Sequence, residues 1–110
     1  MNEPSYSLGN FEELVLLAVF RLAENAYGAS IRQAVAEATG RDTSVGAVYA
    51  TLDRLERKGY VKSWLGEGTP ERGGRPKRYF SVEGAGEEAL RVTEGMRKKL
   101  TGWREGLKPA

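Results

Sequence analysis

The sequence of 110 residues contains no cysteine and no histidine. Without cysteine the chain can form neither disulfides nor thiolate metal sites, which suits a reducing compartment such as the cytoplasm. The absence of histidine removes the commonest general base and the commonest metal ligand together. We therefore predict that the protein is not an enzyme and that it has no metal site and no cofactor.

Long hydrophobic runs are also missing. The longest, Leu14 to Phe20, has seven residues, whereas a membrane-spanning helix needs roughly 20. Residues 1–4 place no basic segment before an apolar stretch, so we expect no secretory signal. With 40% hydrophobic and 29% charged residues, the composition is that of a folded globular domain. We predict a cytoplasmic protein that does not bind membranes.

Positive charge is concentrated in one part of the chain. The whole sequence has a net charge of only +2, but residues 54–78 hold eight of the 17 Lys and Arg and three of the 15 Asp and Glu. That stretch has a net charge of +5 and the remaining residues a net charge of −3. Such clustering is typical of a surface that binds a polyanion, although a solvated basic loop would show it too.

Apolar spacing predicts three helices in the first half of the chain. Helical periodicity predicts a helix over 11–24, with Asn10 as its N-cap and Glu13 bonding back to the cap. A second apolar stripe ends at Gly40, and a third helix is expected over 45–58, capped by Ser44 and ended by Gly59. On this third helix we expect the side that carries Ala47, Ala50, Thr51 and Arg54 to face away from the core.

After Gly59 the pattern changes to that of a β-hairpin. Residues 60–65 and 77–82 are rich in aromatic and β-branched residues, and the segment between them is rich in glycine, proline and charge. From about residue 83 the pattern is helical again, with apolar residues separated by three or four positions as in a heptad seam. Glycines at 84, 86, 95, 102 and 106 would make this last helix marginal alone, so we expect it to pack on a partner surface.

This order of elements predicts a mainly α (α+β) fold, a winged helix-turn-helix with a two-stranded wing and a C-terminal dimerisation helix. We expect residues 1–82 to form the DNA-binding domain, with a flexible N-terminal arm, and residues 83–110 to form the dimerisation helix. In such a motif the N-terminal residues of the later helix enter the major groove, and a basic hairpin lies against phosphates. The predicted contacts with double-stranded DNA are Ser44, Val45, Gly46, Ala47, Tyr49, Arg54, Arg72, Gly73, Gly74, Arg75, Lys77 and Arg78.

The apolar seam predicts a homodimer. Its interface is expected to be formed by the last helix, through Ala89, Val92, Met96, Leu100, Trp103 and Leu107. Met96 and Trp103 can in addition contact a small aromatic effector, since an indole stacks on flat rings and methionine adapts to varied shapes.

Two other functions are compatible with the same pattern. The basic wing could instead grip an acidic protein partner. The chain could also be an architectural protein that binds DNA without sequence preference.

Four stretches resemble the PadR-like transcriptional regulators: LGNFE at 8–12, AYG at 26–28, SVGAVYATLDRLERKG at 44–59 and ERGGRPKRYF at 71–80. The resemblance implies a repressor of nearby genes that is released by a small molecule or another signal. It also implies a dimer built through the C-terminal helix and packed on the first helix, which adds Phe11 and Val15 to the expected interface. It also implies that Tyr49 and the basic residues of the wing contact DNA. The chain departs from many members at Ala50, where they have proline, and at Glu83, where they have threonine.

Overall fold

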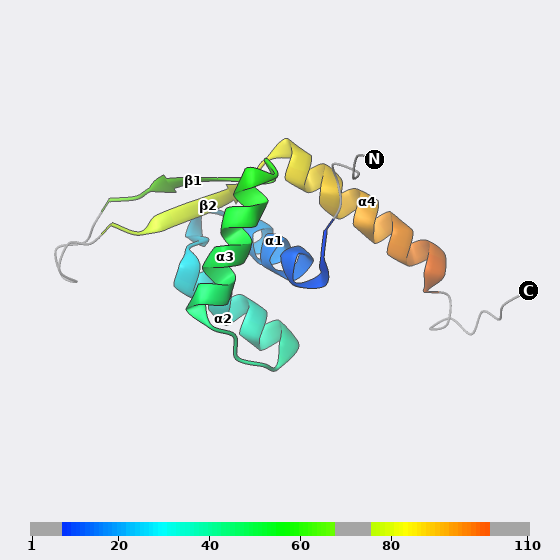
Figure 1. Cartoon of the computed structure of the whole chain (residues 1–110), viewed down its shortest axis with the longest axis horizontal. Coiled ribbons are helices and arrows are strands. Elements are labelled where there is room, and N and C mark those ends of the chain that lie inside the picture. Colours follow the sequence, from blue (N-terminus) through cyan, green and yellow to red (C-terminus); the bar gives the residue numbers. More distant parts are fainter. Residues whose placement is uncertain (1–7, 68–75, 102–110) are drawn as a thin grey trace, which may run out of the picture.

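The computed structural model describes residues 8–67 and 76–101, and within them the chain forms four α-helices and one two-stranded antiparallel sheet (Figure 1). The predicted mainly helical α+β class is confirmed. In chain order the elements are α1 (Asn10–Leu22), a 3-10 turn (Ala23–Asn25), α2 (Gly28–Thr39), α3 (Val45–Arg57), β1 (Val61–Leu65), β2 (Arg78–Val82) and α4 (Gly84–Leu100).

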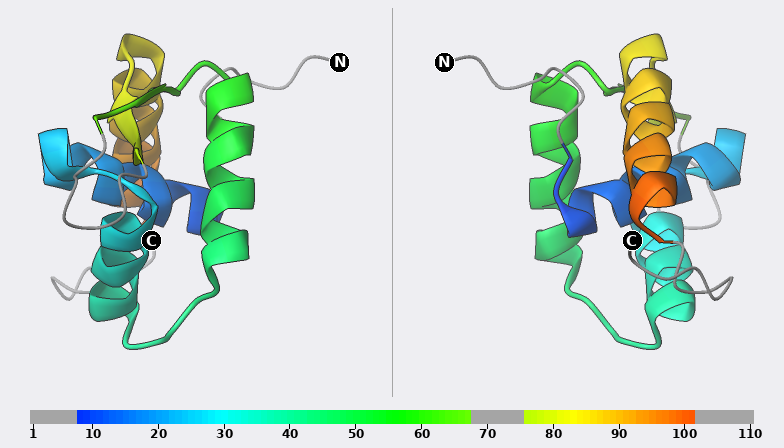
Figure 2. Two further views of the ribbon diagram at one scale, coloured as in Figure 1. Left: turned by 90° about the vertical axis from the view of Figure 1, so that its left-hand side faces the viewer. Right: turned by 90° about the vertical axis from the view of Figure 1, so that its right-hand side faces the viewer.

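The hydrophobic core is centred on α1, which packs against α2, α3, α4 and β2. Figure 2 shows α3 standing on one side of α1 and α4 on another. Because the apolar side chains recur at helical spacing, each helix turns one stripe inward. The buried apolar residues are Val15, Leu16, Ala18, Val19, Ala26, Ile31, Val35, Val48, Leu52, Leu55, Tyr60, Val61, Phe80 and Ala89.

Glycines end α2 and α3 as predicted. Gly40 has φ of 72° and Gly59 has φ of 81°, in the left-handed region that residues with a Cβ avoid. The start of α1 differs from the prediction by one residue. Gly9, not Asn10, is its N-cap, and the Gly9 N–H donates to Oε1 of Glu12 at 2.8 Å. Glu12 therefore has the capping role that we assigned to Glu13.

A short extended segment, Ala26 and Tyr27, pairs with β2 and so joins the wing to the helices. Phe80 N–H of β2 donates to the carbonyl of Ala26 at 2.9 Å, and Tyr27 forms an isolated antiparallel bridge with Tyr79. Within the hairpin Trp64 lies opposite Tyr79, and the two rings stack with centroids 6.2 Å apart. Ala26 and Tyr27, which connect α1 to α2, thus also fix the base of the wing.

The start of α4 is held against the beginning of β1. Glu83 N–H donates to the carbonyl of Tyr60 at 2.8 Å. Gly86 is buried so closely against that same carbonyl that an added Cβ would collide with it. From there α4 extends away from the sheet alongside α1 (Figure 1).

Among the described residues, no helix is both long and apolar enough to cross a membrane.

Candidate nucleic-acid interface

The N-terminal turn of α3 is presented to solvent. The hydroxyl of Ser44 accepts a hydrogen bond from the Ala47 N–H at 3.0 Å, which confirms the predicted N-cap. Ser44, Val45 and Gly46 are exposed, whereas Ala47 is half-buried. Four of the residues predicted to contact DNA therefore lie together at the tip of one helix, where small side chains allow the backbone a close approach.

The connector between α2 and α3 is held by Arg32. Its Nε donates to the carbonyl of Thr43 at 2.7 Å, and its guanidinium lies 3.4 Å from Asp42. The turn that sets the angle of α3 is thus fixed from α2, immediately before the Ser44 cap.

An exposed stripe runs along the length of α3. Gly46, Ala50, Asp53 and Arg57 follow one another at intervals of four, three and four residues, and all are exposed. Sequence reasoning missed Arg57, although its helical spacing from Gly46 and Ala50 could have identified it. Thr51, which we predicted to lie on this outer side, is only 2% exposed, so that part of the prediction is wrong.

Tyr49 lies at the junction of α2, α3 and the wing. Its ring packs against Phe80 with centroids 6.5 Å apart, and its hydroxyl lies so close to Gly28 that an added Cβ there would collide with it. The Tyr49 side chain is half-buried, and its hydroxyl makes no hydrogen bond within residues 8–67 and 76–101. The hydroxyl thus points to the N-terminal end of α2.

Arg54 is already paired inside the chain. Its Nε lies 3.4 Å from Oε2 of Glu12, and its guanidinium donates to the hydroxyl of Thr51 at 3.2 Å. Lys58, one turn further along α3, donates to both oxygens of the same Glu12 at 2.9 and 3.1 Å. Sequence reasoning identified Arg54 but not the acid that holds it.

The pKa of Glu12 is lowered from its usual value near 4.5. Burial alone would raise this pKa, but the hydrogen bond from the Gly9 N–H, the bond and charge of Lys58 and the bond from Arg54 together outweigh it. Burial and the charge of Glu12 both raise the pKa of Tyr60, which lies under Lys58.

Two basic residues of the wing that we predicted to bind DNA differ in their surroundings. The guanidinium of Arg78 lies 2.7 Å from Glu56 and 3.6 Å from Asp53, and its Nε donates to Ser63 at 3.1 Å. The ammonium of Lys77 instead lies 4.2 Å from the centre of the Tyr27 ring. Arg78 is thus occupied in joining the wing to α3, while Lys77 has only a cation–π partner among the described residues. Arg72, Gly73, Gly74 and Arg75 lie outside the described residues.

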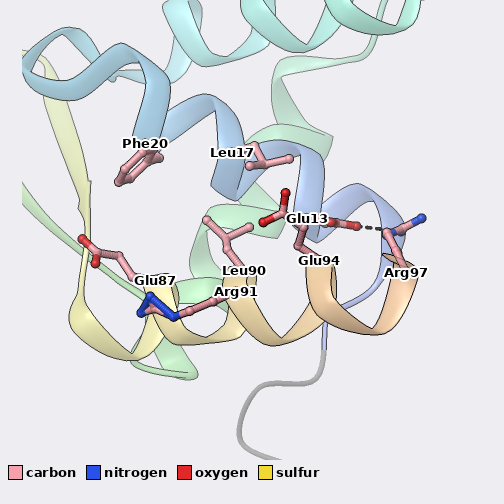
Figure 3. A pocket seen from close by; sticks show the side chains of 8 residues that line it. All are labelled: Glu13, Leu17, Phe20, Glu87, Leu90, Arg91, Glu94 and Arg97. Carbon is pink, nitrogen blue, oxygen red and sulfur yellow. Dashed lines mark hydrogen bonds and ion pairs between the residues drawn. The ribbon is translucent and has the colours of Figure 1, made fainter. Parts of the chain in front are cut away.

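On a different face, α1 and α4 border a groove of about 370 Å³. Figure 3 shows Leu17 and Phe20 of α1 and Leu90 of α4 along it, with Glu13 and Arg97 paired at one end. The Arg97 guanidinium lies 2.7 Å from Glu13. Leu17 is 44% exposed and Phe20 57% exposed, which is unusual for large apolar side chains.

The groove changes which residues can form the predicted dimer interface. Val15 and Ala89 are fully buried within one chain, so they offer no surface to a second copy and leave the predicted set. Phe11 and Val92 are half-buried, and Met96 and Leu100 are exposed along α4. Trp103 and Leu107 lie outside the described residues. Leu17 and Phe20 were missed because they belong to a continuous apolar run, in which spacing alone does not separate buried from exposed positions.

Among the described residues, no group of three or more acidic side chains is placed to hold a metal ion.

The family model described as "Transcriptional regulator PadR-like family" matches residues 16–92 of the sequence. The chain belongs to this PadR-like family. Membership makes it a DNA-binding transcriptional regulator and not an enzyme. The match spans all of α2, α3, the wing and the first half of α4, so the geometry described above is that of the family's winged helix.

Solved structures agree with this assignment. A PadR-like transcription factor from Bacteroides fragilis is 26% identical with a TM-score of 0.72, covering 89% of each chain. A Streptococcus transcriptional regulator is 31% identical with a TM-score of 0.69, covering 90% of this PadR-like chain and 92% of the other. A PadR family regulator from Clostridium difficile, 22% identical with a TM-score of 0.68, shares the fold over 89% and 97% of the two chains. Among curated proteins no sequence matches this chain.

Proposed function

We propose that this PadR-like regulator is a homodimeric repressor that binds a pseudo-palindromic operator in double-stranded DNA. The observation that carries this proposal is the apolar groove between α1 and α4. In a single chain Leu17 and Phe20 of the groove are exposed. Met96 and Leu100, further along α4, are exposed as well, and soluble proteins usually cover such an apolar surface with a partner.

The charge distribution along α4 favours a second copy as that partner. The first turn of α4 carries Glu87, and its last turn carries Arg97, Lys98 and Lys99. Two such helices packed antiparallel would place the acidic end of each beside the basic end of the other. The pairing of opposite charges would then fix the direction of the second helix as well as its position.

Each protomer would present the tip of α3 and the wing to one half-site. The exposed tip formed by Ser44, Val45 and Gly46 fits the major groove, and Lys77 and the basic tip of the wing would contact phosphates. Tyr49 would contribute its hydroxyl, and Arg54 and Arg78 would serve mainly as positioned charges. A neighbour that shares this fold over 27% of its own chain, the Orc1 protein of Aeropyrum pernix (24% identical, TM-score 0.64, covering 87% of this chain), was solved in complex with DNA.

The finer regulatory role follows from the resemblance of the sequence to repressors of this family. We propose residues 1–82 as the DNA-binding domain and residues 83–110 as the dimerisation segment, in a protein that works in the cytoplasm. An aromatic effector contacting Met96 and Trp103 would act at the dimer interface, where it can change the separation of the two recognition helices.

The assembly can be tested with one pair of variants. We expect the purified protein to be dimeric at micromolar concentration, and Phe20→Glu to make it monomeric by placing a charge in the groove. Leu65→Glu is the matched control, because Leu65 is 69% exposed and pairs with Arg78, at the end of the hairpin opposite to the one from which α4 begins. Light scattering coupled to gel filtration measures both. A monomeric wild-type protein, or a dimer that survives Phe20→Glu, would contradict the proposal.

DNA binding is tested with a duplex selected by the wild-type protein from a random pool. The affinity of the wild-type protein for this duplex should fall steeply as the salt concentration rises, because Lys and Arg displace counterions from phosphates. A scrambled duplex should bind far more weakly. Equal affinity for both duplexes would indicate an architectural protein, and no DNA binding at low salt would favour an acidic protein partner instead.

A further inference from the structure

Two neighbouring glutamates in the first turn of α1 bind different helices. Glu13 pairs with Arg97 of α4 at 2.7 Å. Glu12 pairs with Arg54 and Lys58 of α3. A single helical turn of α1 therefore joins the groove-lining helix α4 to the recognition helix α3.

The Glu12 carboxylate is almost completely enclosed by donors. The residue is 7% exposed, its Oε1 accepts from the Gly9 N–H and Lys58, and its Oε2 accepts from Lys58 and Arg54. Burying a carboxylate is costly unless its oxygens are paired, and here each oxygen has two donors. Such a fully paired group has a defined position and fixes that of its partners.

Glu12 also supplies the attachment at one end of the recognition helix. The N-terminal end of α3 follows the connector that Arg32 holds through the Thr43 carbonyl. The C-terminal end carries Arg54 and Lys58, like charges four residues apart that repel each other without an acid between them. The Glu12 charge both relieves that repulsion and draws this end of α3 onto α1.

We propose that Glu12 is a positioning residue for sequence-specific DNA binding: it fixes α3 on α1 and thereby sets the separation of the two recognition helices. This inference rests on the proposed dimer, because α1 also lines the groove that would receive the second copy. Operator recognition depends on that separation, since both helices must reach half-sites about one helical turn apart. Binding to a duplex without the operator depends mainly on charge and not on the separation.

The test compares Glu12→Gln with Glu13→Gln. Both variants remove one negative charge from the same turn, but among the described residues Glu13 makes no hydrogen bond or ion pair with α3. The probes are the duplex selected by the wild-type protein and a scrambled duplex of equal length, at protein concentrations where gel filtration shows the dimer. We expect Glu12→Gln to lose about tenfold or more of the preference for the selected duplex, because charged hydrogen bonds that hold α3 are lost. Glu13→Gln should keep most of it.

Two results would overturn the inference. One is an equal loss of preference in both variants, which would make Glu12 no more than a stabilising residue. The other is a gain in affinity for both duplexes with a steeper salt slope, which would show that Glu12 withholds Arg54 and Lys58 from phosphates. If the wild-type protein itself shows no preference between the duplexes, the proposed operator binding fails and this inference fails with it, whereas the two results above overturn the inference alone.

A second variant approaches the same link from α3, for the case in which Glu12→Gln does not fold. Lys58→Met keeps the side-chain length and leaves Glu12 paired with Arg54. We expect it to reduce the preference for the selected duplex while leaving the salt slope unchanged. If the salt dependence of DNA binding shows that Lys58→Met releases about one counterion fewer than the wild type, Lys58 contacts a phosphate directly. That result would overturn the inference.

Discussion

Arg78 at the start of β2 lies 2.7 Å from Glu56 on α3, so an ion pair joins the wing to the recognition helix. Asp53, 3.6 Å away on the next exposed turn, adds a second acid to the same guanidinium. The two parts of the motif that face DNA are therefore held at a fixed angle. With Glu12 on the opposite flank, α3 is bound by ion pairs both to α1 and to the wing.

This arrangement predicts different roles for two adjacent wing cations. Lys77→Met should reduce the salt slope of DNA binding by about one ion, because its charge is free to neutralise a phosphate. Arg78→Met should weaken binding with little change in slope, because two acids already neutralise that guanidinium and the variant releases the wing. Affinities measured over a series of salt concentrations distinguish the two, and equal slopes for both variants would contradict the assigned roles.

Replacing two glycines of α4, Gly86 and Gly95, with alanine should change the stability of the protein in opposite directions. Gly86→Ala should lower the free energy of unfolding by about 1–3 kcal/mol, because its Cβ would collide with the Tyr60 carbonyl and crowd Val82. Gly95→Ala should raise it by about 0.5–1 kcal/mol, because nothing lies within 4 Å of its added Cβ and alanine favours helix. Urea unfolding monitored by circular dichroism measures both, and destabilisation by Gly95→Ala would show that a partner covers this position.

Most of the fold could be predicted because local signals agree with one another. Ser44 before an apolar stripe, Gly40 and Gly59 after two others, and aromatic alternation beyond residue 60 each define an element boundary to within one or two residues. The cap of α1 was misplaced by one residue. Asn10 and Glu13 have the same spacing as Gly9 and Glu12, and only the three-dimensional position of Lys58 and Arg54 shows which glutamate turns inward.

The candidate interface was less predictable, because sequence gives residue types but not their partners. Arg54 and Arg78 look equivalent to Lys77 as cations, yet each has an acid within 3.4 Å that lies far away in the sequence. Val15 and Ala89 fit an apolar seam, but α1 and α4 bury them against the same core. Contacts between residues that are distant in the sequence produce no regular spacing by which they could be predicted.

The paired state of Glu12 predicts a dependence of stability on pH. Its pKa is lowered in the folded protein relative to the unfolded chain, so its contribution to stability is complete above about pH 4.5 and is lost as the pH falls further. Wild-type protein should therefore lose more stability on acidification than Glu12→Gln, which has no proton to take up there. Urea midpoints at neutral pH and at several acidic values provide the comparison, and parallel curves for the two proteins would contradict it.

The exposed stripe of α3 leads to a prediction for Arg57, whose side chain has no ion-pair partner among the described residues. Arg57→Ala should weaken binding to the selected duplex by about 1–3 kcal/mol if the guanidinium reads a base, and should lower the salt slope by about one ion if it contacts a phosphate. Arg21→Ala is the matched control, because Arg21 is also an exposed arginine but lies near the end of α1, outside the α3 stripe. Comparing the selected and scrambled duplexes separates the two roles, since loss of a base contact affects only the selected one. Unchanged binding to both duplexes would mean that only the first turns of α3 face DNA.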